Sequence, residues 1–208
     1  MYYYKLTVSL KDTPKKVYRE FYVSPYVSLY ELGLNIVFSF NGAMEHFFYY
    51  NEKVKKINFE DCSWLEERYC EDYAYDYKDV TFNYLTKLTT KFNFIYDTGE
   101  DYIFEGNIAQ HLYPIDDTEH VILIKGKGYG IFEDAHSLLH DFLESDHKFI
   151  DVCNEYTGGT EWLPLELKFP LDGTKEDYFK SLTKSQINQL IESIKIGVKE
   201  VFNNECEE

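Results

Sequence analysis

Three carboxylates stand within five positions between two aromatic segments, at Asp97, Glu100 and Asp101. Carboxylate oxygens are the ligands that hard cations such as Ca²⁺ and Mg²⁺ prefer, so this spacing could bind one. The EF-hand pattern is absent, and Asp and Gly also form turns, because Asp accepts hydrogen bonds from nearby amides and Gly adopts positive φ freely. The favoured interpretation is the solvated acidic tip of a β-hairpin, and we assign no metal ligand.

The same turn begins with Asp97-Thr98-Gly99, the tripeptide of the active-site loop of aspartic proteases. That chemistry requires two carboxylates that share a proton, one from each lobe or subunit. The chain contains no second such tripeptide, so a homodimer would be needed, and Glu100 and Asp101 would crowd negative charge around the pair. An aspartate-based hydrolase is therefore kept as an alternative, because a three-residue motif is weak evidence for an active site without its structural context.

Histidines supply further candidate chemistry. His46 could act as a general base, because an imidazole titrates near neutral pH, but without an assigned nucleophile a structural role is favoured. His136 and His140 have the spacing of two metal ligands on a helix, yet the Glu of H-E-x-x-H is missing. We expect a solvated helix face there, no cofactor and no assigned catalytic residue. The candidate binding residues are His46, Asp97, Glu100, Asp101 and Tyr102.

A glycine-rich segment, residues 126–130, follows an apolar run and precedes a helical pattern. A strand, a glycine-rich loop and a helix together form the layout that cradles phosphate groups. The spacing differs from G-x-G-x-x-G, and no lysine followed by Ser or Thr completes a P-loop. We therefore favour a tight turn.

The charge balance argues against some classes of binding partner. The chain has 208 residues, with 21 Lys plus Arg against 37 Asp plus Glu and a formal net charge of −16. Because nucleic-acid affinity depends on basic residues that neutralise phosphates, this balance disfavours direct binding to nucleic acids and to anionic membranes, and it permits a basic protein partner. The sequence shows no signal-peptide pattern and no apolar run of transmembrane length, so we expect a cytoplasmic protein. Four scattered cysteines favour reduced thiols.

Apolar periodicity predicts the elements that position these residues. A period of two indicates strands, as at residues 2–10, where Tyr2, Tyr4 and Leu6 share one face. The predicted strands span residues 2–10, 17–23, 46–50, 53–59, 92–96, 102–105 and 120–124, the last of them buried on both faces. The predicted helices span residues 29–40, 131–143 and 183–201, with a short one from Thr174. We expect loops at residues 60–79, an acidic and Tyr-rich insertion, and at residues 111–119.

Two capping boxes fix the starts of helices. Ser28 with Glu31 and Thr183 with Gln186 each place a hydroxyl and a long polar side chain three positions apart, which satisfies the first free amides of a helix. The helix after Thr183 has a clear apolar stripe, so we expect it to cover the sheet.

The order of these pieces resembles the plasmid pRiA4b ORF-3-like domain family. Members share an I-W-R-R-F strand, here 17–21 (VYREF), and an aromatic strand, here 46–49 (HFFY). They also share a Y-D-F-G-D-D-W hairpin, here 96–102 (YDTGEDY), and a glycine loop, matched loosely by 126–130. The resemblance covers about residues 2–145. Thr98 stands where the family has Phe, so the protease-like tripeptide is an incidental match, and the family's Cys- and Pro-rich segment is missing.

The resemblance implies an α+β fold and no established biochemical activity. Some members are labelled mobile-element passengers or resolvase-like, but no serine-recombinase arrangement occurs here and the acidity disfavours DNA. We predict a single α+β domain over residues 1–208, a mostly antiparallel sheet packed against helices, with a family-like core at 2–145 and a helical part at 146–208. We expect a non-catalytic interaction or binding module. The alternative is a metal-dependent or aspartate-based hydrolase that uses the Asp97–Asp101 turn.

Overall fold

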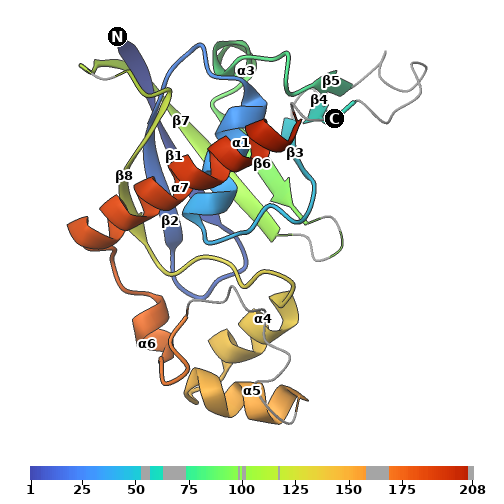
Figure 1. Ribbon diagram of the computed structural model, residues 1–208, viewed down its shortest axis with the longest axis vertical. Coiled ribbons are helices and arrows are strands. Elements are labelled where there is room, and N and C mark those ends of the chain that lie inside the picture. The colour runs from blue at the N-terminus through green and yellow to red at the C-terminus, as the bar shows by residue number, and fades with distance from the viewer. Residues whose placement is uncertain are drawn as a thin grey trace.

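The computed structural model describes residues 1–52, 57–62, 74–97, 99, 102–116, 118–157 and 169–205. Its strands are β1 (Tyr2–Leu10), β2 (Val17–Val23), β3 (Phe48–Glu52), β4 (Ile57–Glu60), β5 (Ala74–Asp76), β6 (Lys91–Tyr96), β7 (Tyr102–Pro114) and β8 (Val121–Lys127). They form one sheet in the order β5-β4-β3-β6-β7-β1-β2-β8 (Figure 1). The β4–β5 pair is parallel and the other pairs of described strands are antiparallel, which confirms the predicted α+β class.

The first strand, β1, lies inside the sheet between β2 and β7. Tyr4 pairs with Val23 of β2 and with Leu112 of β7, and the β1–β7 register shifts between Tyr4 and Leu6. The pairing with β1 carries β7 on to Pro114, so the loop predicted over residues 111–119 was placed too early. The ladder with β1 outweighs the turn signal of the local sequence, because it gives the backbone of β7 regular hydrogen-bond partners.

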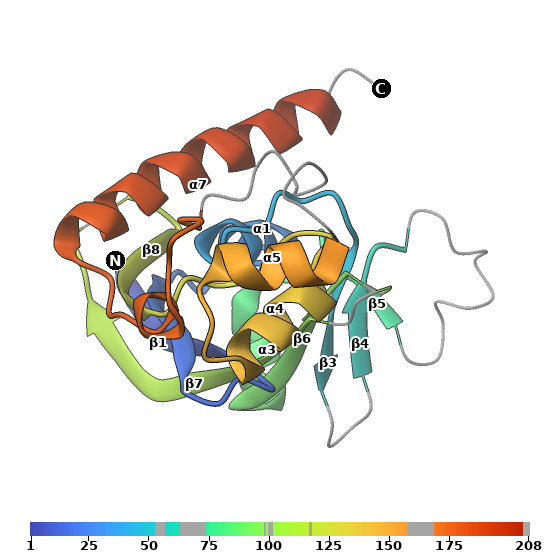
Figure 2. The same cartoon turned by 90° about the horizontal axis from the view of Figure 1, so that it is seen from below.

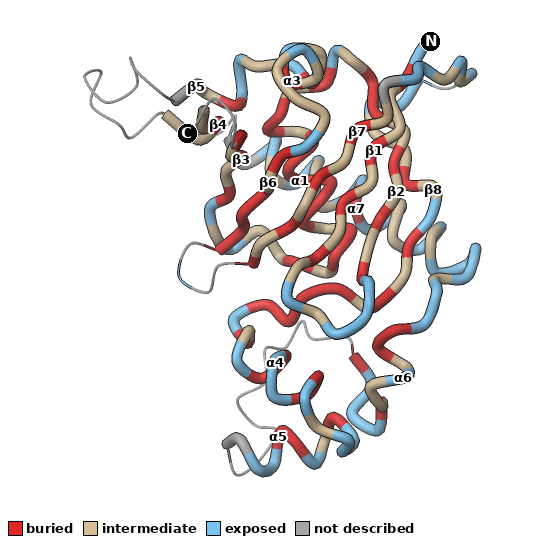
Figure 3. Tube along the Cα trace, turned by 180° about the vertical axis from the view of Figure 1, so that it is seen from behind, coloured by how far each residue is buried: buried red, intermediate tan, exposed pale blue. Residues whose placement is uncertain are grey.

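One face of the sheet forms the core. Buried and half-buried residues alternate along β2 and along β1 from Leu6 onwards, as expected for strands that bury one face, and Figure 3 shows this pattern from behind. The first residues of β1 depart from it, since Tyr2 is exposed and Tyr3 is buried. Phe92, Phe94 and Tyr96 of β6 are all buried, as their predicted common face requires. The strand β8 is at the edge of the sheet and buries Leu123 but only half-buries its neighbours. The expectation of a strand buried on both faces was therefore wrong.

Arg19 of β2 is fully buried on the core face. Its Nε donates to the carbonyl of Ser39 at 2.7 Å, and its Nη2 donates to the carbonyl of Tyr129, also at 2.7 Å. The guanidinium also lies over the ring of Phe40, 4.6 Å from its centroid. Burial lowers the pKa of Arg19 to about 10, so the side chain stays charged at neutral pH. It ties β2 to the end of the first helix and to the glycine segment.

The described helices are α1 (Leu29–Ser39), α3 (Phe82–Leu88), α4 (His136–Glu144), α5 (Phe149–Thr157), α6 (Lys175–Tyr178) and α7 (Lys184–Glu205). Both α1 and α7 lie on the same side of the sheet, with α7 outermost (Figures 1 and 2). Ser28 caps α1 by accepting a hydrogen bond from the amide of Glu31 at 3.0 Å, which confirms the first half of the predicted capping box. The carboxylate of Glu31 lies 3.4 Å from Nδ1 of His120. Among the described residues, no helix combines the length and apolar character needed to cross a membrane.

The last helix packs against α1 and β8. Gly197 brings α7 close to α1, because a Cβ at this position would lie 2.6 Å from the ring of Phe38. Thr183 and Gln186 exchange the hydrogen bonds of the predicted capping box. The predicted apolar stripe of α7 faces the core through Ile194, which is buried, and through half-buried neighbours.

The helices α4, α5 and α6 lie beyond one end of the sheet (Figure 1). An aromatic cluster holds them there, in which the ring of Phe132 contacts those of Phe149 and Phe169 at 5.0 and 5.8 Å. Thr174 and Asp177 form a capping box at the start of α6, where a short helix was expected. A division of the chain near residue 145 stays a prediction.

Several local predictions were wrong at their boundaries. Helix α4 begins at His136 and not at residue 131, because Ile131 donates its amide to Phe40 at 2.8 Å and Asp134 has a left-handed φ of 53°. Residues 131 and 132 are nevertheless buried, so their apolar character serves packing without a helix. The predicted strand at 46–50 begins two residues later, and residues 53–56 lie outside the described part. In the predicted loop at 60–79, residues 74–76 form β5, and residues 63–73 lie outside the described part.

Candidate functional site

Two segments that are far apart in the chain meet beside the paired ends of β3 and β6. Phe48 of β3 pairs with Tyr96 of β6, so His46, just before β3, comes next to Asp97, just after β6. The amide of Asp97 donates to the carbonyl of Phe47 at 3.0 Å and fixes this junction. The register of an antiparallel pair therefore places an imidazole beside a carboxylate.

A third segment brings Glu133 and Asp134 to the same place. The backbone of Gly130 has a φ of 130°, and a Cβ there would lie 2.1 Å from the carbonyl oxygen of Phe40. Gly130 therefore lets the chain pass directly against the end of α1. The hydrogen bond from Ile131 to Phe40 then holds the segment that carries the two acids.

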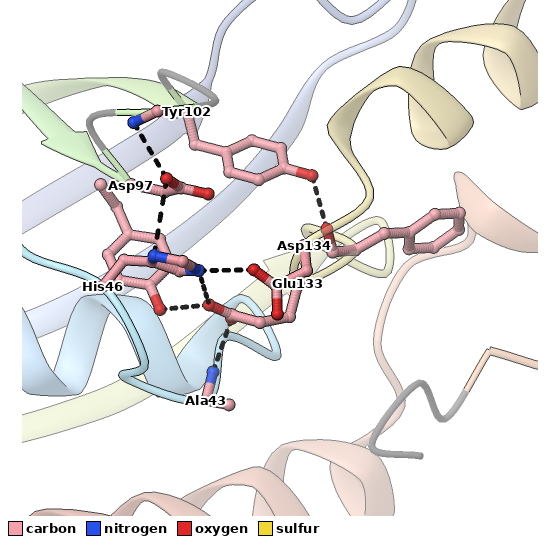
Figure 4. A network of polar contacts seen from close by, with 9 residues as sticks. Ala43, His46, Asp97, Tyr102, Glu133 and Asp134 are labelled. Atoms are coloured by element: carbon pink, nitrogen blue, oxygen red, sulfur yellow. Dashed lines mark hydrogen bonds and ion pairs between the residues drawn. The ribbon is translucent and has the colours of Figure 1, made fainter. Parts of the chain in front are cut away.

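His46 lies among three carboxylates (Figure 4). Its Nε2 is 2.6 Å from Oδ1 of Asp134 and 3.8 Å from Oε1 of Glu133, and its Nδ1 is 3.7 Å from Oδ1 of Asp97. We call these four residues, His46, Asp97, Glu133 and Asp134, the His46 centre. The contact with Asp134 is a short hydrogen bond, and the other two are ion pairs at longer range.

Opposing effects set the charge of His46. Burial alone would lower the pKa of His46, but the hydrogen bond to Asp134 and the charges of Asp97, Asp134 and Glu133 outweigh it and raise the pKa. The protonated imidazole is thus favoured at neutral pH more than in an isolated histidine.

Glu133 is buried, and its two oxygens have separate donors. The hydroxyl of Tyr96 donates to Oε1, and the amide of Ala43 donates to Oε2 at 2.7 Å. Burial raises the pKa of Glu133, and the hydrogen bonds from Tyr96 and Ala43 together with the charge of His46 offset only part of that effect. A carboxylate with a raised pKa beside an imidazole is a combination typical of proton-transferring or ion-binding sites.

Unusual backbone geometry sets the direction of the Asp97 and Asp134 side chains. Asp97 has a φ of 59° and Asp134 a φ of 53°, both in the left-handed region that Asp tolerates better than most residues. The amide of Gly99 donates to Oδ1 of Asp97 at 3.1 Å, which makes the turn that orients this side chain. Asp97 is 3% exposed, whereas the side chain of Asp134 is 47% exposed. The centre therefore has a buried side and a side open to solvent.

The structure brings together two of the five predicted binding residues, His46 and Asp97. Tyr102 is buried, and its hydroxyl donates to the carbonyl of Phe132 at 2.7 Å. It therefore supports the segment that carries Glu133 and Asp134. Its ring also contacts His136, with centroids 4.5 Å apart. Glu100 and Asp101 lie outside the described residues.

Sequence reasoning did not single out Glu133 and Asp134. Their positions fall inside the helix predicted over residues 131–143, where acids on an amphipathic pattern indicate solvated positions. A signal was present, because the two acids follow closely after the glycine-rich segment 126–130, and loops commonly carry functional side chains.

The centre suits a divalent metal ion with mixed nitrogen and oxygen ligands. One ligand atom from each of His46, Asp97 and Asp134 lies within 4.8 Å of the other two. Imidazole nitrogen and carboxylate oxygens together are used for Zn²⁺ and Mn²⁺. Metal ligands bind in their deprotonated form, so a bound ion would replace the hydrogen bond between His46 and Asp134.

A groove of about 240 Å³ opens beside His46. Its described lining residues are Tyr30, Met44, Glu45, His46, Phe47, Phe48, Asp61, Tyr77 and Val201, and we call it the aromatic groove. The groove joins the His46 centre through the imidazole, so a molecule bound in it would lie next to the centre.

Comparisons with known proteins agree with this fold and leave the chemistry open. A solved structure described as a protein of unknown function, MM3350 from Methanosarcina mazei Go1, is 17% identical with a TM-score of 0.59. The match covers 85% of this chain and 97% of that one, and it supports the shared fold alone. No curated protein matches the chain. The model of the plasmid pRiA4b ORF-3-like protein family matches residues 2–164. The chain therefore belongs to the plasmid pRiA4b ORF-3-like family, as the resemblance in its motifs predicted.

Proposed function

We propose that the protein binds a divalent cation, Zn²⁺ or Mn²⁺, through His46, Asp97 and Asp134. One observation carries this proposal: three segments far apart in the sequence place an imidazole and two carboxylates with ligand atoms within 4.8 Å of one another. Asp97 is buried. An ordinary ion-pair network at the surface does not require a buried carboxylate to meet an imidazole and a second carboxylate. Buried charges are usually paired or bind metal ions.

The reaction class that fits a cation at this position is hydrolysis. A bound divalent ion lowers the pKa of a water ligand, and Glu133 stands beside the three ligands as a group that could accept a proton from that water. The aspartate-based version of the hydrolase fits less well. In that mechanism two carboxylates share a proton directly, with no imidazole between them, whereas a metal centre uses an imidazole as a ligand.

Isothermal titration calorimetry of chelator-treated protein with Zn²⁺ and with Mn²⁺ tests the proposal. The wild-type protein should bind one equivalent of at least one ion, and Asp134→Asn should weaken that binding by about tenfold or more, because it removes a charged ligand. His140→Gln is a matched control for His46→Gln, since His140 also pairs with carboxylates, those of Asp141 and Glu144, on an exposed helix face. Equal affinity in the wild-type and His46→Gln proteins would rule the centre out.

A second proposal is the non-catalytic binding module, and the aromatic groove favours it. The groove is large enough for a side chain and lies at the surface, which suits a partner that inserts one residue. We include the predicted cytoplasmic location in this second proposal. Native mass spectrometry of protein purified from its own host should find a stoichiometric complex. A bare mass without partner would contradict this second proposal.

A further inference from the structure

A pocket of about 230 Å³ lies where α7 packs over α1 and β8 (Figure 1). We call it the α7 pocket. It shares no described lining residue with the aromatic groove or with the His46 centre. Since a water-sized group occupies about 30 Å³, the pocket accommodates a molecule of roughly seven or eight non-hydrogen atoms.

Branched aliphatic side chains form much of the wall of the α7 pocket. Val121 and Leu123 come from β8, and Ile191, Ile194 and Val198 come from α7. The three residues of α7 are spaced as i, i+3 and i+7, so they lie along one stripe of the helix. Leu123 and Ile194 are buried, and the other three are half-buried. Such a wall favours the burial of a hydrocarbon chain.

A nearly buried amide oxygen adds one polar group to this apolar wall. Asn35 of α1 lines the pocket and is 8% exposed. Its Nδ2 donates to the carbonyl of Glu31 at 2.8 Å, and this bond identifies the other terminal atom as the oxygen. No group in the described part of the chain donates to Oδ1 of Asn35. A buried acceptor without a donor costs free energy, so a ligand that donates a hydrogen bond there gains affinity.

The charged side chains around the pocket balance one another. Oε1 of Glu119 lies 3.2 Å from Nζ of Lys195, and Oε2 of Glu31 lies 3.4 Å from Nδ1 of His120. Lys199 also lines the pocket, so two carboxylates face two ammonium groups. A charged ligand would disturb this balance and would lose hydration in an apolar pocket, whereas a neutral ligand avoids both costs.

We propose that the α7 pocket binds a small aliphatic alcohol. Its hydroxyl is neutral and donates one hydrogen bond to Oδ1 of Asn35, and its chain packs on Leu123, Ile194 and Val198. The volume of the pocket corresponds to a chain of roughly six or seven carbon atoms. This site requires neither a cation in the His46 centre nor a partner in the aromatic groove.

An NMR titration with 1-hexanol tests the inference, because the side-chain amide signals of Asn35 report on its oxygen directly. The comparison compound is 1-methoxypentane, an isomer of 1-hexanol that cannot donate a hydrogen bond. We expect 1-hexanol to shift the Asn35 signals and to bind about fivefold more tightly than its isomer, which corresponds to roughly 1 kcal/mol for one hydrogen bond. Hexylamine and hexanoate, with a cationic and an anionic head group, should bind more weakly than 1-hexanol.

Two variants locate the binding. Asn35→Leu keeps the size of the side chain and removes the acceptor, so it should bind 1-hexanol no better than 1-methoxypentane, as followed on the backbone amide of Leu123. Val198→Phe fills the pocket and should abolish binding. Ile196→Phe is the matched control, because residue 196 is 58% exposed on the same helix and is not part of the pocket lining, and it should bind normally. Circular dichroism checks that all three variants are folded.

Each other outcome overturns the inference. Equal affinity for 1-hexanol and 1-methoxypentane would show that no donor is recognised at Asn35. Tighter binding of hexylamine or of hexanoate would assign the pocket to an ion. Equal loss in the folded Val198→Phe and Ile196→Phe proteins would place the alcohol outside the pocket, and unchanged Asn35 signals at saturating 1-hexanol would do the same.

Discussion

The hydroxyl of Tyr96 donates a hydrogen bond to Oε1 of Glu133, which joins the end of β6 to the segment after Gly130. Both side chains are buried, and the amide of Ala43 donates to the other oxygen of Glu133. The same carboxylate lies 3.8 Å from Nε2 of His46. Glu133 thus connects the sheet, the segment after α1 and the imidazole, and its position depends on Tyr96.

Removing that hydroxyl should therefore cost stability. We expect Tyr96→Phe to lower the free energy of unfolding by about 1–3 kcal/mol, because a buried carboxylate loses a donor. Urea unfolding measures the change. Tyr26→Phe, at a side chain that is 71% exposed, is the matched control and should change stability by less than about 0.5 kcal/mol. Equal effects of the two substitutions would contradict a structural role for the Tyr96–Glu133 bond.

Gly130 should not tolerate a side chain. Its φ of 130° is a conformation that L-residues rarely adopt, and an added Cβ would meet the backbone of Phe40. Gly130→Ala should therefore destabilise the protein by at least about 1–3 kcal/mol in thermal or urea unfolding. Gly99→Ala is the matched comparison, since the nearest atom to its Cβ would be 3.4 Å away, and it should be milder. A reversed order would show that the close approach to Phe40 relaxes freely.

Asp177 should make stability depend on acid pH. Hydrogen bonds from Lys180 and from Thr174 hold the pKa of Asp177 well below its ordinary value near 3.8. A carboxyl whose pKa is lowered in the folded state stabilises the protein at pH values above its ordinary pKa. That contribution is lost progressively as the pH falls below the ordinary pKa towards the lower pKa of the folded state. The melting temperature of Asp177→Asn should lie below that of the wild type at pH 7, and the gap should close in acid. Asp172→Asn, at another exposed aspartate, is the control and should leave the melting temperature at pH 7 unchanged.

Much of the fold follows from local patterns. The alternation of Tyr4, Leu6 and Val8 and the cap at Ser28 each act within a few residues, and the structure confirms the strand and the helix that they predicted. Local patterns were wrong where long-range pairing decides the outcome. The extension of β7 to Pro114 depends on β1, about a hundred residues earlier, and no local signal at Pro114 reports it.

Two of the four residues of the His46 centre could be predicted from the sequence. His46 and Asp97 could be chosen because an imidazole and an acidic turn are visible as residue types, but their proximity comes from the β3–β6 register. Glu133 and Asp134 were missed because apolar neighbours such as Phe132 imitate the spacing of a helix. The contact between Gly130 and Phe40 cancels that helix, and it joins residues 90 positions apart.

The place of β1 inside the sheet has a consequence during synthesis. After β2 has paired, the other edge of β1 waits for β7, whose last paired residue is Pro114. Until the ribosome has released that segment, β1 presents unpaired backbone groups that can pair with a neighbouring chain. Slow translation before residue 102, or a shortage of chaperones, should therefore favour aggregation over folding.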